Sequence, residues 1–216
     1  GFGFVARVDG RKTRETVEEG LEILRNLEHR GARGSDPETG DGAGILLQLP
    51  DAFFRREAGR LGIELPPPGH YAVGTLFESE EGLGAERMLE EIAAEEGQRV
   101  LGFRDVPVDA ERCGRLARRV MPRIRQFFVG REAPDEMAFE RKLYVIRRRL
   151  HKAVADTHAC YVVTLSSRTI VYKGLLTGVQ LPEFYLDLQD PAVQSAIALV
   201  HARFSTNTLG SWELAH

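Results

Sequence analysis

Two apolar runs separated by a short polar break, CYVVTLSS (160–167) and TIVYKGLL (169–176), decide the fold class of this chain. Val, Ile, Tyr and Thr are enriched in β-strands, and each run has the length of one strand. The break at Ser167-Arg168 predicts a tight hairpin and therefore an antiparallel sheet. Further strand-like runs lie at 1–8, 44–49, 70–77, 99–108, 123–129 and 197–204.

Helices are expected between these strands, because apolar residues there recur every three or four positions. Thr13 is a suitable N-cap for the first of them. The last long helix, 139–155, carries Arg147, Arg148, Arg149 and Lys152 opposite its apolar stripe, which indicates a solvated face. The expected helices are 14–28, 51–62, 82–97, 113–121, 139–155 and a short one beginning at Asp190-Pro191.

The order of these elements predicts one domain over 1–216 with an α/β insertion or subdomain at 70–135. The predicted order of elements in residues 70–129 is β-α-β-α-β, and this stretch follows the Pro-Pro-Pro-Gly break at 66–69. The first strand begins at the first residue, and GSWELAH (210–216) ends the sequence without a helix stop. We therefore expect a domain truncated at both ends, belonging to a larger protein.

The composition excludes several classes of protein. Of the 216 residues 43% are hydrophobic and 28% charged, which suits a globular core and excludes disorder throughout. The formal net charge of −3 disfavours a nucleic-acid binder. No apolar run reaches the ~18 residues of a membrane span. The N-terminal residues show no basic region followed by an apolar stretch, so no signal peptide is expected. Two cysteines make neither a disulfide framework nor a four-ligand zinc site, which favours a reducing, cytoplasmic setting.

Most candidate sites in the sequence lack the residue spacing that their chemistry requires. Gly40-Asp41-Gly42-Ala43-Gly44 lacks the Lys-Ser or Lys-Thr of a phosphate loop, and a strand rather than a helix follows it. Phosphate binding and a tight loop with φ > 0 remain as alternatives for this segment. The six histidines show no metal-ligand spacing, so no metal site is expected. Cys113 and Cys160 lie in a basic helix and an apolar strand, which favours packing roles.

The segment HARFSTNT (201–208) is the strongest candidate for a binding site. It ends an apolar strand and gathers Arg203, Ser205, Thr206 and Asn207 within a few residues. An arginine pairs bidentately with a carboxylate, and hydroxyls and amides take the remaining hydrogen bonds of an amino acid. The alternative is a capped turn without a ligand.

Several segments together resemble one known family. They are GFGFVA (1–6), EHRGARGSDPETGDGAGILLQLP (28–50), FERKLYVIRR (139–148), SSRTIVYKGLL (166–176) and HARFSTNT (201–208), and they span nearly the whole chain. The sequence is similar to the N-terminal glutaminase domain of the glutamate synthase large subunit, a class II glutamine amidotransferase. The resemblance implies an α+β fold, the four-layer αββα sandwich of N-terminal-nucleophile hydrolases with two stacked antiparallel sheets.

The activity implied by the resemblance is hydrolysis of L-glutamine to glutamate and ammonia. An N-terminal Cys attacks the side-chain amide, and its own α-amino group is the base. In the full-length enzyme ammonia passes to a synthase domain that makes glutamate from 2-oxoglutarate. That remainder is expected to hold FMN and an iron–sulfur cluster, with a possible small subunit carrying the electron-donor site. No cofactor, metal, nucleic acid or membrane is expected for the glutaminase domain itself.

The family pattern transfers to this sequence with one departure. The family begins Cys-Gly-x-Gly-Phe, whereas this sequence begins at the second residue of that pattern, so the catalytic Cys is expected immediately before Gly1. The resemblance assigns Arg203 to the glutamine α-carboxylate and Arg30 to orienting the nucleophile. It places Thr206, Asn207, Phe204 and Gly31 at the substrate. The oxyanion-hole Asn-Gly of the family follows the segment that contains Trp212, beyond His216.

These matches leave two main hypotheses of different classes. The first is a glutaminase domain, with residues 1–216 alone inactive because the Cys and the oxyanion loop lie outside them. The second is a non-catalytic glutamine-binding or assembly module that lacks the nucleophile. A stand-alone α/β binding protein is a third alternative, against which the segment 201–208 argues. Intact mass separates the first two hypotheses, because one additional cysteine favours the enzyme.

Overall fold

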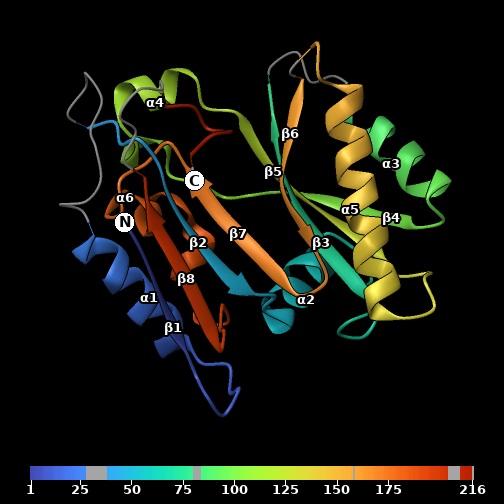
Figure 1. Cartoon of the computed structure of the whole chain (residues 1–216), viewed down its shortest axis with the longest axis horizontal. Helices are drawn as coiled ribbons and strands as arrows, with labels where there is room; N and C mark the ends of the chain where they lie inside the picture. The colour runs from blue at the N-terminus through green and yellow to red at the C-terminus, as the bar shows by residue number, and fades with distance from the viewer. Residues whose placement is uncertain (28–37, 80–83, 158, 204–209, 216) are drawn as a thin grey trace. The chain divides into compact units, whose positions relative to one another are not determined.

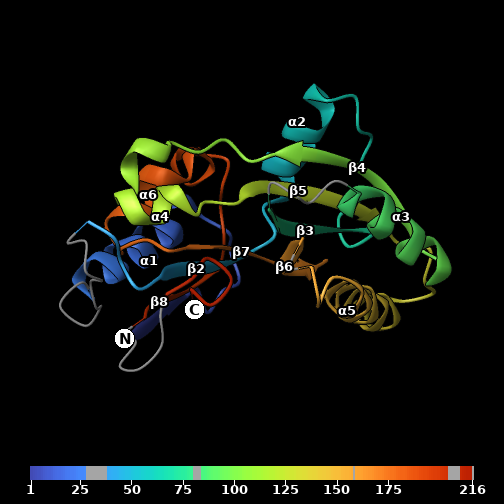
Figure 2. The same ribbon diagram turned by 90° about the horizontal axis from the view of Figure 1, so that it is seen from above.

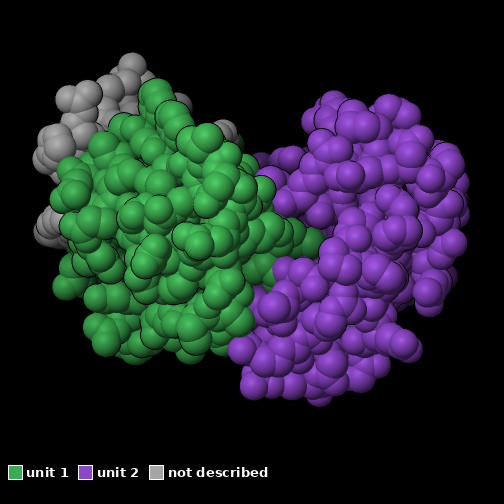
Figure 3. All heavy atoms as spheres, turned by 90° about the horizontal axis from the view of Figure 1, so that it is seen from below, with its two compact units in different colours: residues 1–50, 107–121, 171–216 green, residues 51–106, 122–170 purple. Residues whose placement is uncertain are grey.

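The computed structural model describes residues 1–27, 38–79, 84–157, 159–203 and 210–215, and these carry all structural statements below. The chain divides into two compact units, coloured separately in Figure 3. The first comprises residues 1–50, 107–121 and 171–216, and the second comprises residues 51–106 and 122–170. Each unit contains one antiparallel sheet and its own helices.

The elements alternate along the chain much as the apolar pattern predicts, with ends shifted by a few residues (Figure 1). The strands are β1 (Phe2–Ala6), β2 (Ala43–Gln48), β3 (Tyr71–Glu78), β4 (Arg99–Asp105), β5 (Arg123–Gly130), β6 (Cys160–Ser166), β7 (Thr169–Gly174) and β8 (Ile197–Ala202). The helices are α1 (Arg14–Asn26), α2 (Asp51–Arg60), α3 (Ala85–Glu95), α4 (Arg115–Arg119), α5 (Glu136–Ala153) and α6 (Gln180–Phe184), with 3-10 turns at Ala110–Arg112 and Leu186–Gln189.

The two sheets have four strands each, in the orders β1-β8-β2-β7 and β4-β5-β3-β6. The pairings of β8 with β1 and β2, and of β3 with β5 and β6, are antiparallel, as is that of β4 with β5. An α+β fold with two antiparallel sheets is therefore confirmed.

In the first unit, α1 packs on one face of the sheet. Thr13 caps this helix as expected, since its side chain accepts a hydrogen bond from the amide of Thr16. Close packing depends on small residues: a Cβ on Gly20 would lie 2.6 Å from the Cβ of Ala198, and a Cβ on Gly3 would lie 2.6 Å from Ile23. The helix thus approaches β8 and β1 directly and leaves the opposite face of the sheet for other contacts.

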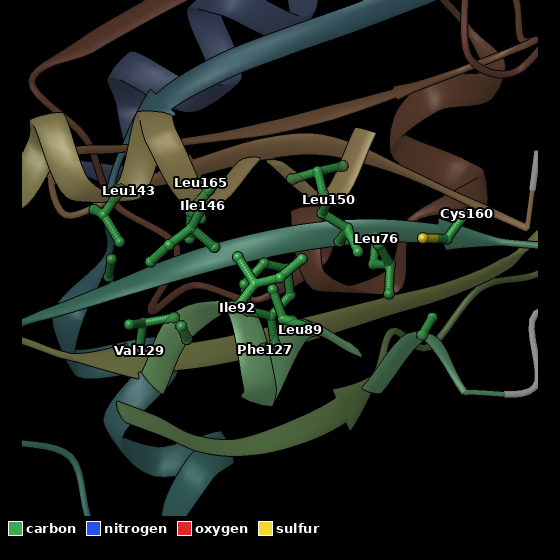
Figure 4. Close-up of a cluster of buried hydrophobic side chains, with 14 of the residues drawn as sticks. Leu76, Leu89, Ile92, Phe127, Val129, Leu143, Ile146, Leu150, Cys160 and Leu165 are labelled. Atoms are coloured by element: carbon green, nitrogen blue, oxygen red, sulfur yellow. The ribbon is translucent and has the colours of Figure 1, made fainter. Parts of the chain in front are cut away.

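In the second unit, helices cover both faces of the sheet (Figure 2). Helices α3 and α5 share one face, where their apolar stripes meet alternate residues of β3, β5 and β6 (Figure 4). Phe127 and Val129 point to this face, whereas Phe128 lies on the other and contacts Phe54 of α2 edge-on at 6.0 Å. Strand β3 is consequently buried along its whole length.

The prediction of a tight hairpin at Ser167-Arg168 is wrong. Strand β6 pairs with β3 in the second sheet, while β7 lies beside β2 in the first. A two-residue hairpin needs positive φ at its centre, and Ser-Arg does not favour that conformation. Instead, Glu140 on α5 accepts hydrogen bonds from the Ser167 amide at 2.7 Å and from the Ser167 hydroxyl at 2.6 Å. The connection is therefore fixed to α5.

Two other predictions from the sequence differ from the structure in detail. The helix expected at Asp190-Pro191 is a turn, in which Asp190 accepts hydrogen bonds from the amides of Ala192 and Val193. The short helices of this region come earlier, at α6 and Leu186–Gln189. Arg148 and Lys152 are exposed on α5 as expected, but Arg149 forms ion pairs with Glu95 and Glu96. The insertion at 70–135 stays a prediction.

Candidate functional site

The site centres on the end of β8, where Arg203 follows Ala202. The backbone amide of Arg203 donates a hydrogen bond to the carbonyl of Gly42 at 2.8 Å. Its guanidinium Nη1 lies 3.4 Å from the carbonyl oxygen of Asp41, and the Arg203 side chain is partly exposed. Both the backbone and the guanidinium of Arg203 are therefore held by the loop before β2. A planar guanidinium held in this way is suited to a carboxylate.

The first residue of the chain lies at the same sheet edge. Gly1 and Ala202 exchange two backbone hydrogen bonds, from Ala202 N to Gly1 O at 2.8 Å and from Gly1 N to Ala202 O at 2.6 Å. Phe2 is paired with His201 in the same antiparallel register. Continuing that register by one position places a residue before Gly1 opposite Arg203.

The glycine segment 40–44 forms tight packing contacts. A Cβ on Gly40 would lie 2.4 Å from the carbonyl oxygen of Leu176. Gly42 has φ +141°, and a Cβ there would lie 2.8 Å from the Cα of Ala215. Because protein atoms occupy the space beside these glycines, the tight-loop interpretation fits the segment better than a phosphate cradle.

A row of side chains crosses the sheet beside this edge. His201 of β8 is in register with Phe2 and with Gly44. A Cβ on Gly44 would lie 2.5 Å from the His201 ring and 3.0 Å from the Cβ of Lys173. The missing side chain at Gly44 thus lets Lys173 and His201 approach each other across β2.

The segment Ser211–Ala215 lies against this row. The buried Lys173 donates from Nζ to the carbonyl of Glu213 at 2.7 Å, and His201 Nε2 lies 3.4 Å from the carbonyl oxygen of Ala215. Trp212 is buried and donates from Nε1 to the carbonyl of Ala117 at 3.0 Å. Sequence reasoning missed Lys173, although a lysine within the apolar run TIVYKGLL was a usable signal.

The other predicted site residues lie outside the described residues. These are Arg30, Gly31, Phe204, Thr206 and Asn207. Their roles stay predictions, and of the predicted substrate contacts the structure places Arg203 alone.

The cysteines have the surroundings of packing residues. Cys113 is buried, and its thiol donates to the carbonyl of Ala110 at 3.3 Å. Burial raises the pKa of the Cys113 thiol, which disfavours the nucleophilic thiolate. Cys160 is buried in the apolar core of the second unit. Arg118 lies near the Cys113 thiol, but burial outweighs its effect on the pKa, and neither cysteine is accessible as a reactive cysteine would be.

Other kinds of site are not found among the residues that the structure describes. No group of three or more His, Cys, Asp or Glu side chains is arranged to hold a metal ion there. None of the described helices is long and apolar enough to cross a membrane. A hollow of about 900 Å³ beside α1 is lined by charged residues such as Glu18, Glu22 and Arg112, and Arg203 is not among its lining residues.

The fold is α+β with two antiparallel sheets, and Arg203 follows the end of β8 in the first of them. The family model for class II glutamine amidotransferases matches residues 1–216. The chain therefore belongs to the class II glutamine amidotransferases.

Within that family the chain is similar to large chains of glutamate synthases. It is 48% identical to the glutamate synthase [NADPH] large chain of Bacillus subtilis, covering 100% of this chain and 14% of the relative. It is 39% identical to the corresponding chain of Azospirillum brasilense, covering 100% and 15%. A ferredoxin-dependent glutamate synthase of Arabidopsis thaliana is also 39% identical, covering 100% and 14%. The chain thus spans about a seventh of the length of these relatives.

Proposed function

We propose that this chain is the glutaminase domain of a glutamate synthase and hydrolyses L-glutamine to glutamate and ammonia. The observation that carries the proposal is the register of β1 and β8. It sets the position before Gly1 opposite Arg203, so a nucleophile there meets a substrate held by its α-carboxylate. A charge-assisted, bidentate arginine–carboxylate pair fixes both the position and the orientation of the glutamine.

The proposed nucleophile is a Cys immediately before Gly1. Its thiol proton passes to its own α-amino group, whose ordinary pKa of about 8 lets it accept a proton at neutral pH. The thiolate adds to the side-chain amide carbon, and the protonated amine then returns a proton to the departing ammonia. Water attacks the resulting thioester and releases glutamate and the free thiol. Neither Cys113 nor Cys160 takes part, because both are buried packing residues.

The remaining predicted residues complete this site in the proposal. Arg30 orients the nucleophile, and Gly31 lets the backbone approach it. Phe204, Thr206 and Asn207 follow Arg203 along the chain and contact the substrate. The oxyanion donors come from the stretch that follows the segment around Trp212.

The rest of the polypeptide supplies the second half of the proposed function. Ammonia passes to a synthase domain that converts 2-oxoglutarate to glutamate, with FMN and an iron–sulfur cluster. The electrons come through that remainder, by way of a small subunit where one exists. The proposed location is the cytoplasm.

Ammonia release by the complete polypeptide tests this function. A polypeptide with Cys exposed before Gly1, and extended beyond residue 216, should release ammonia from glutamine. Iodoacetamide should inactivate it by modifying that first residue, as located by peptide mass spectrometry. Residues 1–216 alone should release none, because removal of a single oxyanion donor already costs roughly 10²–10³ in rate.

The alternative is a non-catalytic glutamine-binding or assembly module. Glutamine binding without ammonia release by the complete polypeptide would favour that module. Hydrolysis by residues 1–216 alone would overturn the proposed nucleophile, since the cysteines within them are buried.

A further inference from the structure

Lys173 is a buried charged residue of the first unit that the proposed chemistry does not use. Its side chain is 5% exposed, and it lies on the sheet face opposite α1, in the row with Gly44 and His201. A buried ammonium costs free energy unless hydrogen bonds compensate it. One of its bonds goes to the backbone of Glu213, 40 positions further along the chain. The lysine therefore ties a distant segment to the sheet.

The tied segment, Ser211–Ala215, is held at both of its ends. Near its start, Trp212 is buried against Phe184 and hydrogen-bonded to Ala117. At its end, Ala215 packs on Gly42, the residue whose carbonyl accepts the Arg203 amide. Lys173 binds the carbonyl between these two points. The segment thus reaches the sheet edge of Arg203 along a path that Lys173 defines.

We propose that Lys173 is a positioning residue for glutamine hydrolysis, acting by fixing the segment Ser211–Ala215 across β2. The proposal rests on the proposed function, in which the chain after this segment supplies the oxyanion donors. His201, which lies 3.4 Å from the Ala215 carbonyl, supports the same segment more weakly. In this proposal Lys173 acts through the segment and not by contact with the substrate.

Because of this placement, we expect the loss of Lys173 to affect kcat and KM differently. The carbonyls of Gly42 and Asp41 hold Arg203, so we expect substrate binding to survive the loss of the lysine. The oxyanion donors follow Ala215, so a looser segment displaces them in the transition state. A misplacement of about 1 Å at a reacting group costs roughly 10²-fold in rate. We therefore expect a lower kcat with KM almost unchanged.

The test compares Lys173→Met, which removes the ammonium, with Lys173→Arg, which keeps a cationic donor. Lys152→Met is the matched control, because Lys152 is an exposed lysine of α5. In the complete polypeptide we expect Lys173→Met to lower kcat about 10- to 100-fold with KM within about threefold. Lys173→Arg should recover part of the rate, and Lys152→Met should match the parent.

Hydrogen–deuterium exchange supplies a readout that does not depend on activity. Amides of 211–215 should exchange faster in Lys173→Met, while peptides from α5 keep the parent rate. If Lys173→Met does not fold, Ser211→Ala replaces it, since Ser211 Oγ accepts the Leu214 amide within the segment at 3.2 Å. That variant should lower kcat in the same direction by a smaller factor.

Unchanged exchange of 211–215, or a raised KM with unchanged kcat, would overturn the role of Lys173. A parent polypeptide without glutaminase activity would instead refute the proposed function, and the exchange measurement would still decide whether Lys173 holds the segment.

Discussion

The backbone amide of Arg203 donates a hydrogen bond to the carbonyl of Gly42 at 2.8 Å, which joins the end of β8 to the loop that leads into β2. Gly42 in turn lies against Ala215 with no room for a side chain. Three segments distant in sequence therefore meet at one edge of the first sheet. The carboxylate clamp proposed at Arg203 depends on this meeting point as well as on the arginine itself.

Replacing Arg203 by lysine tests the clamp directly. A lysine ammonium keeps the charge but cannot form two parallel hydrogen bonds to a carboxylate. Loss of a buried, charged hydrogen bond costs about 2–5 kcal/mol, which is roughly 30-fold or more in affinity. We expect Arg203→Lys in the active polypeptide to raise KM for glutamine by at least that factor. Unaltered affinity, measured by steady-state kinetics and by calorimetry, would refute the clamp.

Replacing Gly42 by alanine tests the meeting point. Gly42 and Gly10 both have positive φ, at +141° and +71°, but a Cβ on Gly10 meets nothing within 4 Å. We expect Gly10→Ala to cost about 1–2 kcal/mol from backbone strain alone. Gly42→Ala should cost about 1–3 kcal/mol more, because Ala215 must move and because a φ of +141° lies outside the left-handed region open to L residues. Urea unfolding of both variants measures the difference, and equal costs would mean that Ala215 yields freely.

The strands of the first sheet show what the sequence could predict and what it could not. Apolar runs placed β2, β7 and β8 within a few residues, because a buried strand needs a continuous apolar stretch. They could not show that β6 and β7 join different sheets, since pairing partners are distant in sequence. In β1 the apolar pair Phe2 and Phe4 is exposed by 78% and 64%, respectively. The face that packs on α1 includes Gly3, which has no apolar signal.

The candidate site likewise has one part that the sequence predicts and one part that it does not. The role proposed for Arg203 follows from the chemistry of the side chain and from the motif around it, and it stays a prediction. For Lys173 the sequence offers only the signal of a lysine within an apolar run, because its proposed role depends on Gly44 and His201 on neighbouring strands and on a backbone carbonyl at Glu213. Functional groups that act through long-range backbone contacts leave only a weak trace in a single sequence.

Replacing Glu140 by glutamine tests what fixes the β6–β7 connection. The Glu140 carboxylate accepts hydrogen bonds from the Ser167 amide and from the hydroxyls of Ser166 and Ser167. Glu140→Gln removes the charge that strengthens these bonds, and we expect a loss of about 1.5–3 kcal/mol in the free energy of unfolding.

The matched control is Glu136→Gln on the same helix. Glu136 pairs with Arg168, and both side chains are about half exposed at 45% and 51%. Exposed pairs contribute about 0–1 kcal/mol. Equal losses in the two variants, measured by urea unfolding, would contradict an anchoring role for Glu140.

The surroundings of His151 predict that the free energy of unfolding falls on acidification. Its Nε2 accepts a hydrogen bond from the Val162 amide at 3.0 Å, and its ring stacks on Tyr161 at 4.9 Å. Burial, followed by the nearby Arg147 and Arg148, holds the pKa of His151 below its ordinary value of 6.5. The unfolded chain therefore binds the proton more readily than the folded chain does.

The free energy of unfolding should consequently fall as the pH drops from 6.5 toward the folded-state pKa of His151, because the unfolded state gains the proton first. Protonation also removes the ring lone pair that accepts the Val162 amide. In His151→Gln the amide oxygen can accept that bond at any pH, so the unfolding temperature should change less between about pH 5.5 and 7.5. His70→Gln is the control, because His70 is an exposed histidine of the same unit. If melting curves of His151→Gln kept the full acid dependence of the parent and His70→Gln lost it, the pH sensitivity would belong to His70.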